Sequence, residues 1–392
     1  MKLNKNFKRL SQGYLFTEME KRVGEYKALN PDNKIINLGV GDYTLPLCEA
    51  VIEELHRAVD DQSKKETFRG YGPEAGYLFL RESIKNYYKT KGVNLESDEI
   101  FVSDGANSDI GNVLELFSSD NPVLVPDPVY PAYVDANIIQ GREVRYLNST
   151  SENSFLPGPP EEKVSSQIIY ICSPNNPTGT VYDRAGLQNF VDYALETDSV
   201  IMFDAAYESF IRENDLPSSI FQIPGAKNCA IEICSFSKIA GFTGVRCGYT
   251  VIPREMLYEG FNVNMLYKRR LAARFNGVSY ISQVGANAVF TKDGLVQVRK
   301  NIDYFRKNAD VLSGALTKKG IFFTGAKNSP YLWFKCPYEM RSWEFFDYLL
   351  KKFGIVGTPG AGFGKNGEGF FRLSSFGTSE ETQLAAQRIL QI

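Results

Sequence analysis

The chain is poor in histidine, since its 392 residues include only His56. A serine–histidine–aspartate site or a multi-histidine metal centre is therefore nearly excluded, and proton transfer must rest on lysine, tyrosine, aspartate or glutamate. His56 lies in the helical-looking stretch 48–59, where we expect an exposed position. Six cysteines are scattered without the spacing of a metal site, so we expect reduced core residues and no bound metal: Cys48, Cys172, Cys229, Cys234, Cys247 and Cys336.

The sequence also lacks long apolar runs and an excess of charge of one sign. No stretch approaches the roughly 20 apolar residues of a membrane span. Lysine and arginine total 44 against 46 for aspartate and glutamate, a net charge of −2, so we expect neither nucleic acid nor a membrane as a partner. The basic start, 1–9, is followed by no apolar signal region, and we expect a cytoplasmic protein.

Short apolar runs alternate with helical patterns between residues 46 and 285. The runs are nearly continuous, as in strands buried on both faces of a mainly parallel sheet. In the helical stretch 76–92, apolar residues recur at steps of three and four. This alternation predicts an α/β fold, with a large domain built on a mostly parallel, doubly wound sheet. The predicted strands are 100–103, 123–125, 168–172, 200–203, 230–234 and 247–251.

The pattern changes after residue 285. A long helical region, 301–319, precedes apolar strand-like runs and a further helix at 342–353, and a last helix follows Ser379. A chain of this length exceeds one ordinary core. We therefore expect a large domain at 46–285 and a smaller α+β domain at 286–392, which the N-terminal arm, 1–45, joins in part.

Polar motifs follow several of these strands, at the edge where open α/β sheets bind ligands. After strand 100–103, Gly105, Ala106 and Asn107 start a helix, and small residues there let an anion approach backbone amides. A simple connection is the alternative. After strand 123–125, prolines flank Tyr130 and hold its ring for stacking on a flat ligand, or it packs against Tyr133 in a proline-rich loop.

The next two motifs are more specific. Asn176 lies in Ser-Pro-Asn-Asn-Pro-Thr-Gly, 173–179, a tight turn that can present its side-chain amide. Asp204 ends the strand 200–203, and Tyr207 follows three residues later. A carboxylate at a strand end can hold a protonated ring nitrogen, while Asn176 and Tyr207 can share an oxygen of the same ligand.

A lysine and two arginines complete the pattern. Lys238 follows an apolar strand in Ser235-Phe-Ser237-Lys238 and is followed by Arg246. The two serines and Arg246 suit a phosphate dianion, and the lysine offers an amine. Arg372 stands inside the apolar run 370–374, where it needs an anion, either a ligand carboxylate or a structural salt bridge.

In order and spacing, these motifs resemble those of the fold-type I, class I/II aminotransferases, and the match spans practically the whole chain. The resemblance implies pyridoxal 5'-phosphate as cofactor, held covalently by Lys238, which also moves the proton. It further implies that Asp204 holds the ring nitrogen, that Asn176 and Tyr207 hold the phenolic oxygen, and that Tyr130 stacks on the ring. The implied phosphate ligands are Gly105, Ala106, Asn107, Ser235, Ser237 and Arg246, although position 107 is often lysine in this family.

The resemblance also implies a homodimer with shared active sites. Tyr71 and Asn276 would then reach the cofactor of the neighbouring subunit, and Gly41 would close over the substrate. Arg372 would hold the α-carboxylate of small amino-acid and 2-oxo-acid substrates. The runs 13–16, 70–76 and 103–110 resemble members whose substrate carries both an ammonium and a carboxylate at its far end, with glutamate as the amino donor. Glu74 and Tyr14 are the residues expected to recognise that end. The alternatives are that Glu74 is a favourable charge at a helix start and that Tyr14 belongs to an arm that packs the dimer.

Other functions share the same cofactor residues. An aspartate- or aromatic-type aminotransferase would need an arginine for a second carboxylate, for which Arg269, Arg270 and Arg274 are candidates. A carbon–sulfur lyase would use the same lysine. A cofactor-sensing regulator would carry an added basic DNA-binding segment, and it ranks last because the aminotransferase-like region begins almost at residue 1 and the chain is not basic.

Overall fold

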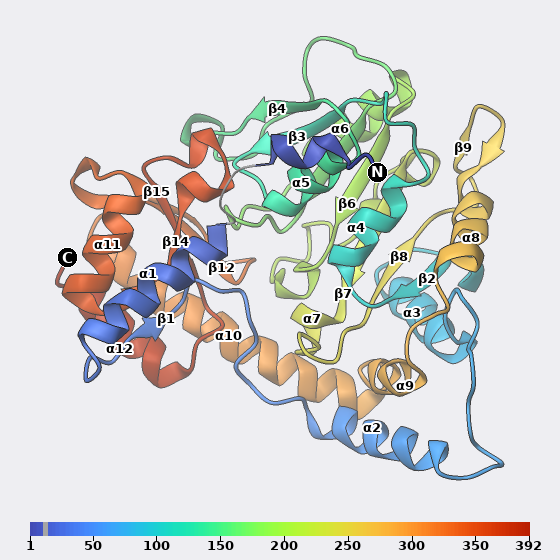
Figure 1. Ribbon diagram of the computed structural model, residues 1–392, viewed down its shortest axis with the longest axis horizontal. Helices are drawn as coiled ribbons and strands as arrows, with labels where there is room; N and C mark the ends of the chain where they lie inside the picture. The colour runs from blue at the N-terminus through green and yellow to red at the C-terminus, as the bar shows by residue number, and fades with distance from the viewer. Residues whose placement is uncertain (11–14) are drawn as a thin grey trace.

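A seven-stranded sheet forms the centre of the computed structural model, which describes residues 1–10 and 15–392 (Figure 1). The strand order is β2-β8-β7-β6-β5-β3-β4, and only β8 runs antiparallel to its neighbours. All six predicted strands are present, while β4 was not predicted. The strands are β2 (Ile100–Ser103), β3 (Val123–Asp127), β4 (Val144–Asn148), β5 (Ile168–Cys172), β6 (Val200–Asp204), β7 (Ala230–Ser235) and β8 (Gly248–Val251).

Both faces of this sheet are buried. On β5, Ile169 and Ile171 belong to one apolar cluster, while Ile168 and Tyr170 belong to another on the opposite face. Because neighbouring residues of a strand point to opposite faces, a strand covered on both sides must be apolar throughout. The helices around it are α2 (Glu49–Gln62), α3 (Leu78–Thr90), α4 (Ala106–Leu114), α5 (Pro131–Ile139), α6 (Arg184–Glu196), α7 (Phe236–Ile239), α8 (Val263–Arg274) and α9 (Tyr280–Ala288).

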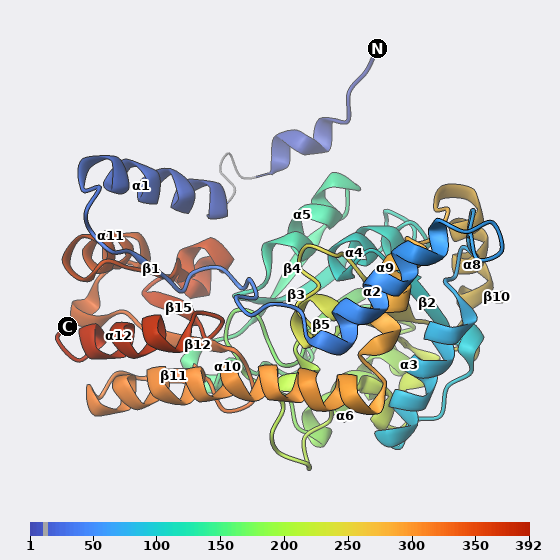
Figure 2. The same cartoon turned by 90° about the horizontal axis from the view of Figure 1, so that it is seen from below.

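A second, antiparallel sheet with the order β11-β12-β15-β14 has its own apolar cluster. The N-terminal segment joins it, because β1 (Ile36–Asn37) pairs with β13 (Ile355–Val356) and α1 lies beside α11 (Figure 2). The other elements of this part are α1 (Leu15–Leu29), β11 (Phe323–Gly325), β12 (Tyr331–Lys335), α11 (Ser342–Phe353), β14 (Thr358–Pro359), β15 (Phe370–Ser374) and α12 (Ser379–Ile389).

The long helix α10 (Lys292–Lys318) connects the two parts and runs along both of them (Figure 2). Val298 and Phe305 pack in the core beside the large sheet, whereas Leu312 and Leu316 pack in the second core. The helix begins at 292 rather than at the predicted 301, so that prediction was wrong. The domain limits at 45 and 285 stay a prediction.

The remaining strands form a small hairpin, β9 (Leu257–Tyr258) with β10 (Phe261–Asn262). His56 is exposed on α2, as predicted, and all six cysteines are free, with only Cys48 less than fully buried. In residues 1–10 and 15–392, no helix is long and apolar enough to cross a membrane, and no cluster of histidine, cysteine and carboxylate side chains could hold a metal ion.

Candidate active site

A cavity of about 440 Å³ opens at the carboxyl ends of β6 and β7, between the large sheet and the second sheet. It brings together twelve of the residues singled out in the sequence, although they are spread over more than 330 positions. These are Gly41, Ala106, Asn107, Tyr130, Asn176, Asp204, Tyr207, Ser235, Ser237, Lys238, Arg246 and Arg372.

Lys238 lies on α7, the single turn that follows β7. The side chain of Ser235 accepts a hydrogen bond from the amide of Ser237 at 3.2 Å and caps this turn. The Lys238 ammonium donates to the carbonyl of Gly41, and burial lowers the pKa of the lysine to about 8. An amine of this kind is neutral at a mildly alkaline pH and can act as nucleophile or base.

Asp204 lies buried beside the lysine, and among the described residues it forms no ion pair. The Tyr133 hydroxyl donates to one carboxylate oxygen at 2.5 Å, and the amide of Ala206 donates to the other at 2.9 Å. Burial raises the pKa of Asp204, while these hydrogen bonds oppose the shift. A cationic group of a ligand would supply the partner that this carboxylate lacks.

Arg372 is 1% exposed on β15 and has no carboxylate partner in the described part of the chain. Its guanidinium donates to the side-chain oxygen of Asn176 at 2.6 Å and to the Gly39 carbonyl at 2.7 Å, while its Nε has no acceptor. It also lies 4.4 Å over the ring of Tyr331. A buried guanidinium held by neutral groups alone is a binding site for an anion.

The hydrogen bond from Arg372 orients the side chain of Asn176. Because its side-chain oxygen accepts from Arg372, its amide nitrogen is the end that can donate to a ligand. The hydroxyls of Tyr207 and Tyr331 lie 2.8 Å apart in the same wall of the cavity. The wall therefore offers one amide and a pair of hydroxyls to the oxygen atoms of a ligand.

The other end of the cavity is a cradle for an anion at the start of α4. Gly105 has φ +133°, and a Cβ at this position would collide with the guanidinium of Arg246. Only glycine therefore lets the arginine lie against the first turn of the helix. Arg246 also donates to the Ser237 hydroxyl at 3.2 Å. The helix start, the guanidinium and the hydroxyl suit a phosphate group.

A buried carboxylate supports this cradle from below. Asp109 accepts from the Ser103 hydroxyl at 2.5 Å and from the Tyr267 hydroxyl at 3.3 Å, and burial raises its pKa to about 7. The Ser103 oxygen in turn accepts from the amide of Gly105 at 3.3 Å. Asp109 thereby holds the turn before α4 in place, a role that the sequence interpretation missed.

Gly105 lies behind Arg246 and does not itself line the cavity, and three other predicted residues lie apart from it. Tyr71, which is 94% exposed, and Asn276 line a separate hollow on the surface, and Glu74 is exposed near them. Tyr14 lies outside the described residues. Of the candidates for a second carboxylate, Arg270 and Arg274 pair with Glu115 at 3.1 and 3.2 Å, and none of the three arginines lines the cavity.

The sequence interpretation also missed Tyr331 and the roles of Tyr133 and Phe16. It missed Thr358 as well, whose hydroxyl accepts from Arg372 at 3.2 Å. Tyr331 contacts both Tyr207 and Arg372, and a Cβ at Gly41 would collide with its hydroxyl. Phe16 lines the cavity from α1. Tyr133 carried a signal, since it follows Tyr130 by three residues at the start of a helix. Tyr331 follows the turn Asn328-Ser329-Pro330, which does not indicate a contact with Tyr207.

Comparison with known proteins agrees with this geometry. Residues 33–389 match the model of the family "Aminotransferase class I and II". The chain therefore belongs to the class I and II aminotransferases, and its fold is that of the fold-type I aminotransferases.

Two relatives and one solved structure carry a more particular name. The chain is 49% identical to the LL-diaminopimelate aminotransferase of Methanosphaera stadtmanae, over 100% of this chain and 99% of that protein. It is 47% identical to the LL-diaminopimelate aminotransferase of Bacteroides fragilis, over 99% and 98%. The structure of L,L-diaminopimelate aminotransferase from Chlamydomonas reinhardtii matches with a TM-score of 0.94 at 38% identity, covering 100% of this chain and 98% of that one.

Proposed function

We propose that this chain is a pyridoxal-phosphate-dependent aminotransferase that makes LL-2,6-diaminopimelate, a precursor of lysine and of cell-wall peptide. It transfers the amino group of L-glutamate to the ring-opened keto form of tetrahydrodipicolinate, and the reaction is reversible. Near 50% identity over the full length of proteins with this activity in their names carries the substrate assignment. The cavity around Lys238 carries the reaction type.

The residues of the cavity fit the cofactor. The cradle at Gly105 and Arg246 suits its phosphate, and the unpaired carboxylate of Asp204 suits its pyridine nitrogen. Asn176 and Tyr207 can donate to its phenolic oxygen, and Tyr130 lies in the same cavity, where it can stack on the ring. When bound, pyridoxal phosphate supplies an aldehyde for the amino group and a ring that withdraws electrons from Cα.

Lys238 is the residue that would hold the cofactor and would move the proton. Its side chain is held at the Gly41 carbonyl, in the same cavity as Tyr207 and Arg372. Its lowered pKa favours the neutral amine, which is the form that accepts a proton. Asp42, Asp204, Arg246 and Arg372 are the charged groups that act on it.

Arg372 holds the α-carboxylate of each substrate. Its fork-shaped guanidinium is held by neutral acceptors, so a carboxylate would replace weak contacts with a charged pair. This contact is the same for glutamate and for diaminopimelate, because both carry an α-carboxylate. Arg372 therefore explains amino-acid binding in general and leaves the choice of substrate to other residues.

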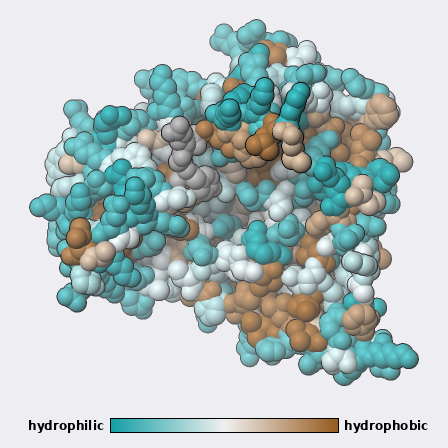
Figure 3. Space-filling model, viewed as in Figure 1, coloured by the Kyte–Doolittle hydropathy of each residue, from teal (hydrophilic) through white to brown (hydrophobic). Residues whose placement is uncertain are grey.

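We further propose a homodimer in which each subunit completes the active site of the other. Tyr71 and Asn276 lie outside the cavity of their own chain, so they serve a cofactor from a second copy. Apolar side chains gather over α2 and α9, along the lower edge of the view in Figure 3. Exposed apolar residues on α2, in the segment after it and at the start of α3 would be covered by that copy: Ile52, Val59, Phe68, Leu78 and Phe79.

Recognition of the far end of diaminopimelate falls to Glu74 from the second copy and to Tyr14. Glu74 is exposed, and among the described residues its carboxylate has neither a hydrogen bond nor an ion pair, so it is free to receive an ammonium. We also propose a cytoplasmic location, since the six free cysteines suit a reducing compartment.

The test is a half-reaction with single amino acids. The purified yellow protein is mixed with one amino acid at a time, and loss of its visible absorbance is followed. Loss with LL-diaminopimelate and glutamate, but not with aspartate or tyrosine, supports the proposal. Loss with aspartate or tyrosine instead makes the protein a general aminotransferase, and no change with any of them removes the catalytic assignment.

A further inference from the structure

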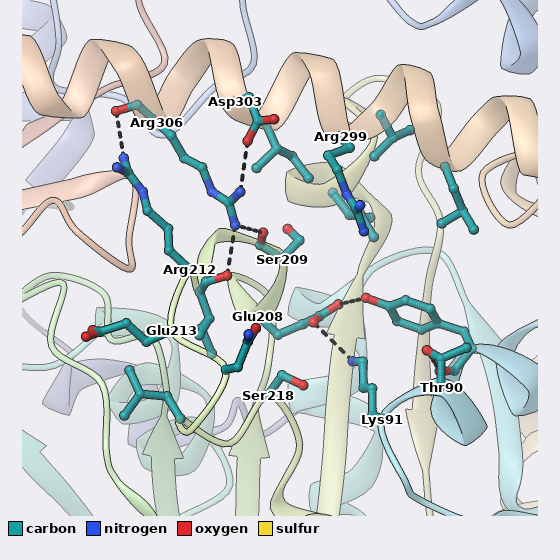
Figure 4. Close-up of a pocket in the computed structure, with 18 of the residues that line it drawn as sticks. Thr90, Lys91, Glu208, Ser209, Arg212, Glu213, Ser218, Arg299, Asp303 and Arg306 are labelled. Carbon is teal, nitrogen blue, oxygen red and sulfur yellow. Dashed lines mark hydrogen bonds and ion pairs between the residues drawn. The ribbon is translucent and has the colours of Figure 1, made fainter.

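A second cavity, of about 1040 Å³, lies behind the wall that carries Tyr207 and shares no lining residue with the active site. Figure 4 shows its two sides, with α10 on one and the segment after β6 on the other. Residues Tyr87, Thr90 and Lys91, at the end of α3, line a third side. The cavity is therefore built by three elements that are far apart in the sequence.

The carboxylates around this cavity are already engaged by cations. Glu208 pairs with Lys91 at 3.0 Å and accepts from the Tyr87 hydroxyl at 2.7 Å. The other three also have cationic partners, in the pairs Asp303 with Arg306, Asp310 with Arg212 and Glu213 with Lys327, at 2.8, 2.9 and 2.6 Å. A cationic ligand would have to compete with all four existing pairs.

Two cationic side chains that line the cavity have no counter-ion among the described residues. Arg299 and Lys307, both exposed on α10, have neither an ion pair nor a hydrogen bond in the described part of the chain. Figure 4 shows Arg299 and Arg306 projecting from α10 toward the segment with Glu208 and Ser209. The charge left unpaired in this cavity is therefore positive and is carried by side chains suited to oxyanions.

Apolar side chains line the cavity as well, from α10 and from the segment after β6. It is lined by Ile211, Leu216, Leu295, Val298 and Ile302 in addition to the charged residues. Pockets for small molecules combine such an apolar surface with a few polar groups that fix the orientation. We propose that this cavity is a second ligand site, which takes a small organic anion with an apolar body and a phosphate or carboxylate group.

The site adjoins the active-site wall through a short segment. Glu208 follows Tyr207 directly in the sequence and begins the short 3-10 helix η4 (Glu208–Phe210). Arg306 donates to the carbonyls of Ser209 and Ile211 at 3.0 and 2.8 Å and so holds the same segment against α10. A ligand in the cavity contacts the segment that positions Tyr207.

The experiment is a calorimetric titration of the cofactor-loaded protein with phenyl phosphate, with benzoate as the carboxylate probe and benzyl alcohol as the neutral one. We expect phenyl phosphate or benzoate to bind and benzyl alcohol not to bind. The double variant Arg299→Gln/Lys307→Gln should weaken that binding at least about tenfold, because it removes both unpaired cations. The thermal midpoint should be unchanged, since both side chains are exposed.

The matched control is Lys292→Gln/Lys300→Gln. It removes the same charge from exposed positions of the same helix that do not line this cavity. Unchanged binding in this control supports a built site. Equal weakening in both double variants, or no binding of either anion, overturns the proposal.

Benzoate could instead be held by Arg372 in the active site. In that case the Arg299→Gln/Lys307→Gln variant would not weaken its binding, and this result also counts against the second site. Failure of the aminotransferase assay would leave the titration interpretable, because the cavity shares no residue with the active site.

Discussion

The cavity around Lys238 and the surface around Tyr71 differ in almost every physical respect. Asp204 and Arg372 are 7% and 1% exposed and are held by hydrogen bonds from their own chain. Tyr71 is 94% exposed, and Glu74 lies on the same open surface. The fold of a single chain organises the cavity around Lys238. The side chains around Tyr71 are left uncovered by the same chain.

In the proposed function, the buried region carries out the reaction and the exposed surface selects the substrate. Asp204 and Arg372, which would hold the ring nitrogen of the cofactor and an α-carboxylate, are buried, and burial strengthens their electrostatic interactions. Arg246 and Asn107, at the phosphate end of the same cavity, are exposed. The residues proposed to recognise the far end of the substrate lie on the exposed surface or outside the described residues. We expect substitutions in the buried region to affect all amino acids alike and substitutions on the exposed surface to affect one substrate.

The largest expected effect is that of Lys238→Ala. Removal of the amine should lower turnover with glutamate by about four orders of magnitude or more, because both the covalent link and the proton transfer are lost. Steady-state turnover measures the loss, and circular dichroism and thermal unfolding should show a folded protein. Lys300→Ala, at an exposed position, is the control. Ordinary turnover by Lys238→Ala would refute its role.

Arg372→Lys should have the next largest effect. The variant keeps the charge but loses the bidentate contact, so kcat/KM should fall about 100-fold, which corresponds to about 3 kcal/mol. The loss should be equal for glutamate and LL-diaminopimelate, since both present an α-carboxylate. Arg341→Lys, at a position 80% exposed, should change neither value. A loss confined to one substrate would contradict the proposed contact.

The pKa of Lys238 gives the third prediction. Burial lowers it to about 8, so in cofactor-free protein the neutral amine should appear as pH rises through about 8. An ordinary lysine would be neutral to less than about 1% at that pH. Acylation of the cofactor-free protein at a series of pH values, read by mass spectrometry of the peptide with Lys238, measures the midpoint. A midpoint above 10 would mean that the amine is not desolvated.

Glu74→Ala should have the smallest effect and the most selective one. We expect kcat/KM for LL-diaminopimelate to fall about fivefold, which corresponds to about 1 kcal/mol for an exposed ionic contact, while kcat/KM for glutamate changes little. Glu74→Gln keeps the shape and removes the charge, so it should lose a similar amount. Equal losses for both substrates would remove Glu74 from recognition of the far end.

Much of the fold was predictable from local pattern. The strands of the large sheet are short apolar runs because both of their faces are covered. Asp204 and Ser235 stand at the carboxyl ends of two of these strands, and these ends indicate where the site lies. The start of α10 was missed although the signal was present: Thr291 accepts a hydrogen bond from the amide of Gly294 and caps the helix.

Other features had no local signal. Tyr331 meets Tyr207 from 124 positions away, and Arg372 meets Asn176 from 196 positions away. These pairs depend on how the second sheet is placed against the first, which periodicity along the chain does not describe. The second cavity behind Tyr207 also arises from three separated elements and belongs to no motif.

The sequence by itself determined the residues that we propose for the chemistry: an amine at 238, a carboxylate at 204, an amide in a proline turn at 176, and arginines at 246 and 372. These are local properties, because each depends on residue type and on a neighbouring strand end or turn. Tertiary structure decided which of them are buried together, that Lys238 is desolvated, and that Arg372 has no carboxylate partner among the described residues. Burial and the absence of a counter-ion are properties of packed surroundings, so they exist only after distant parts of the chain have come together.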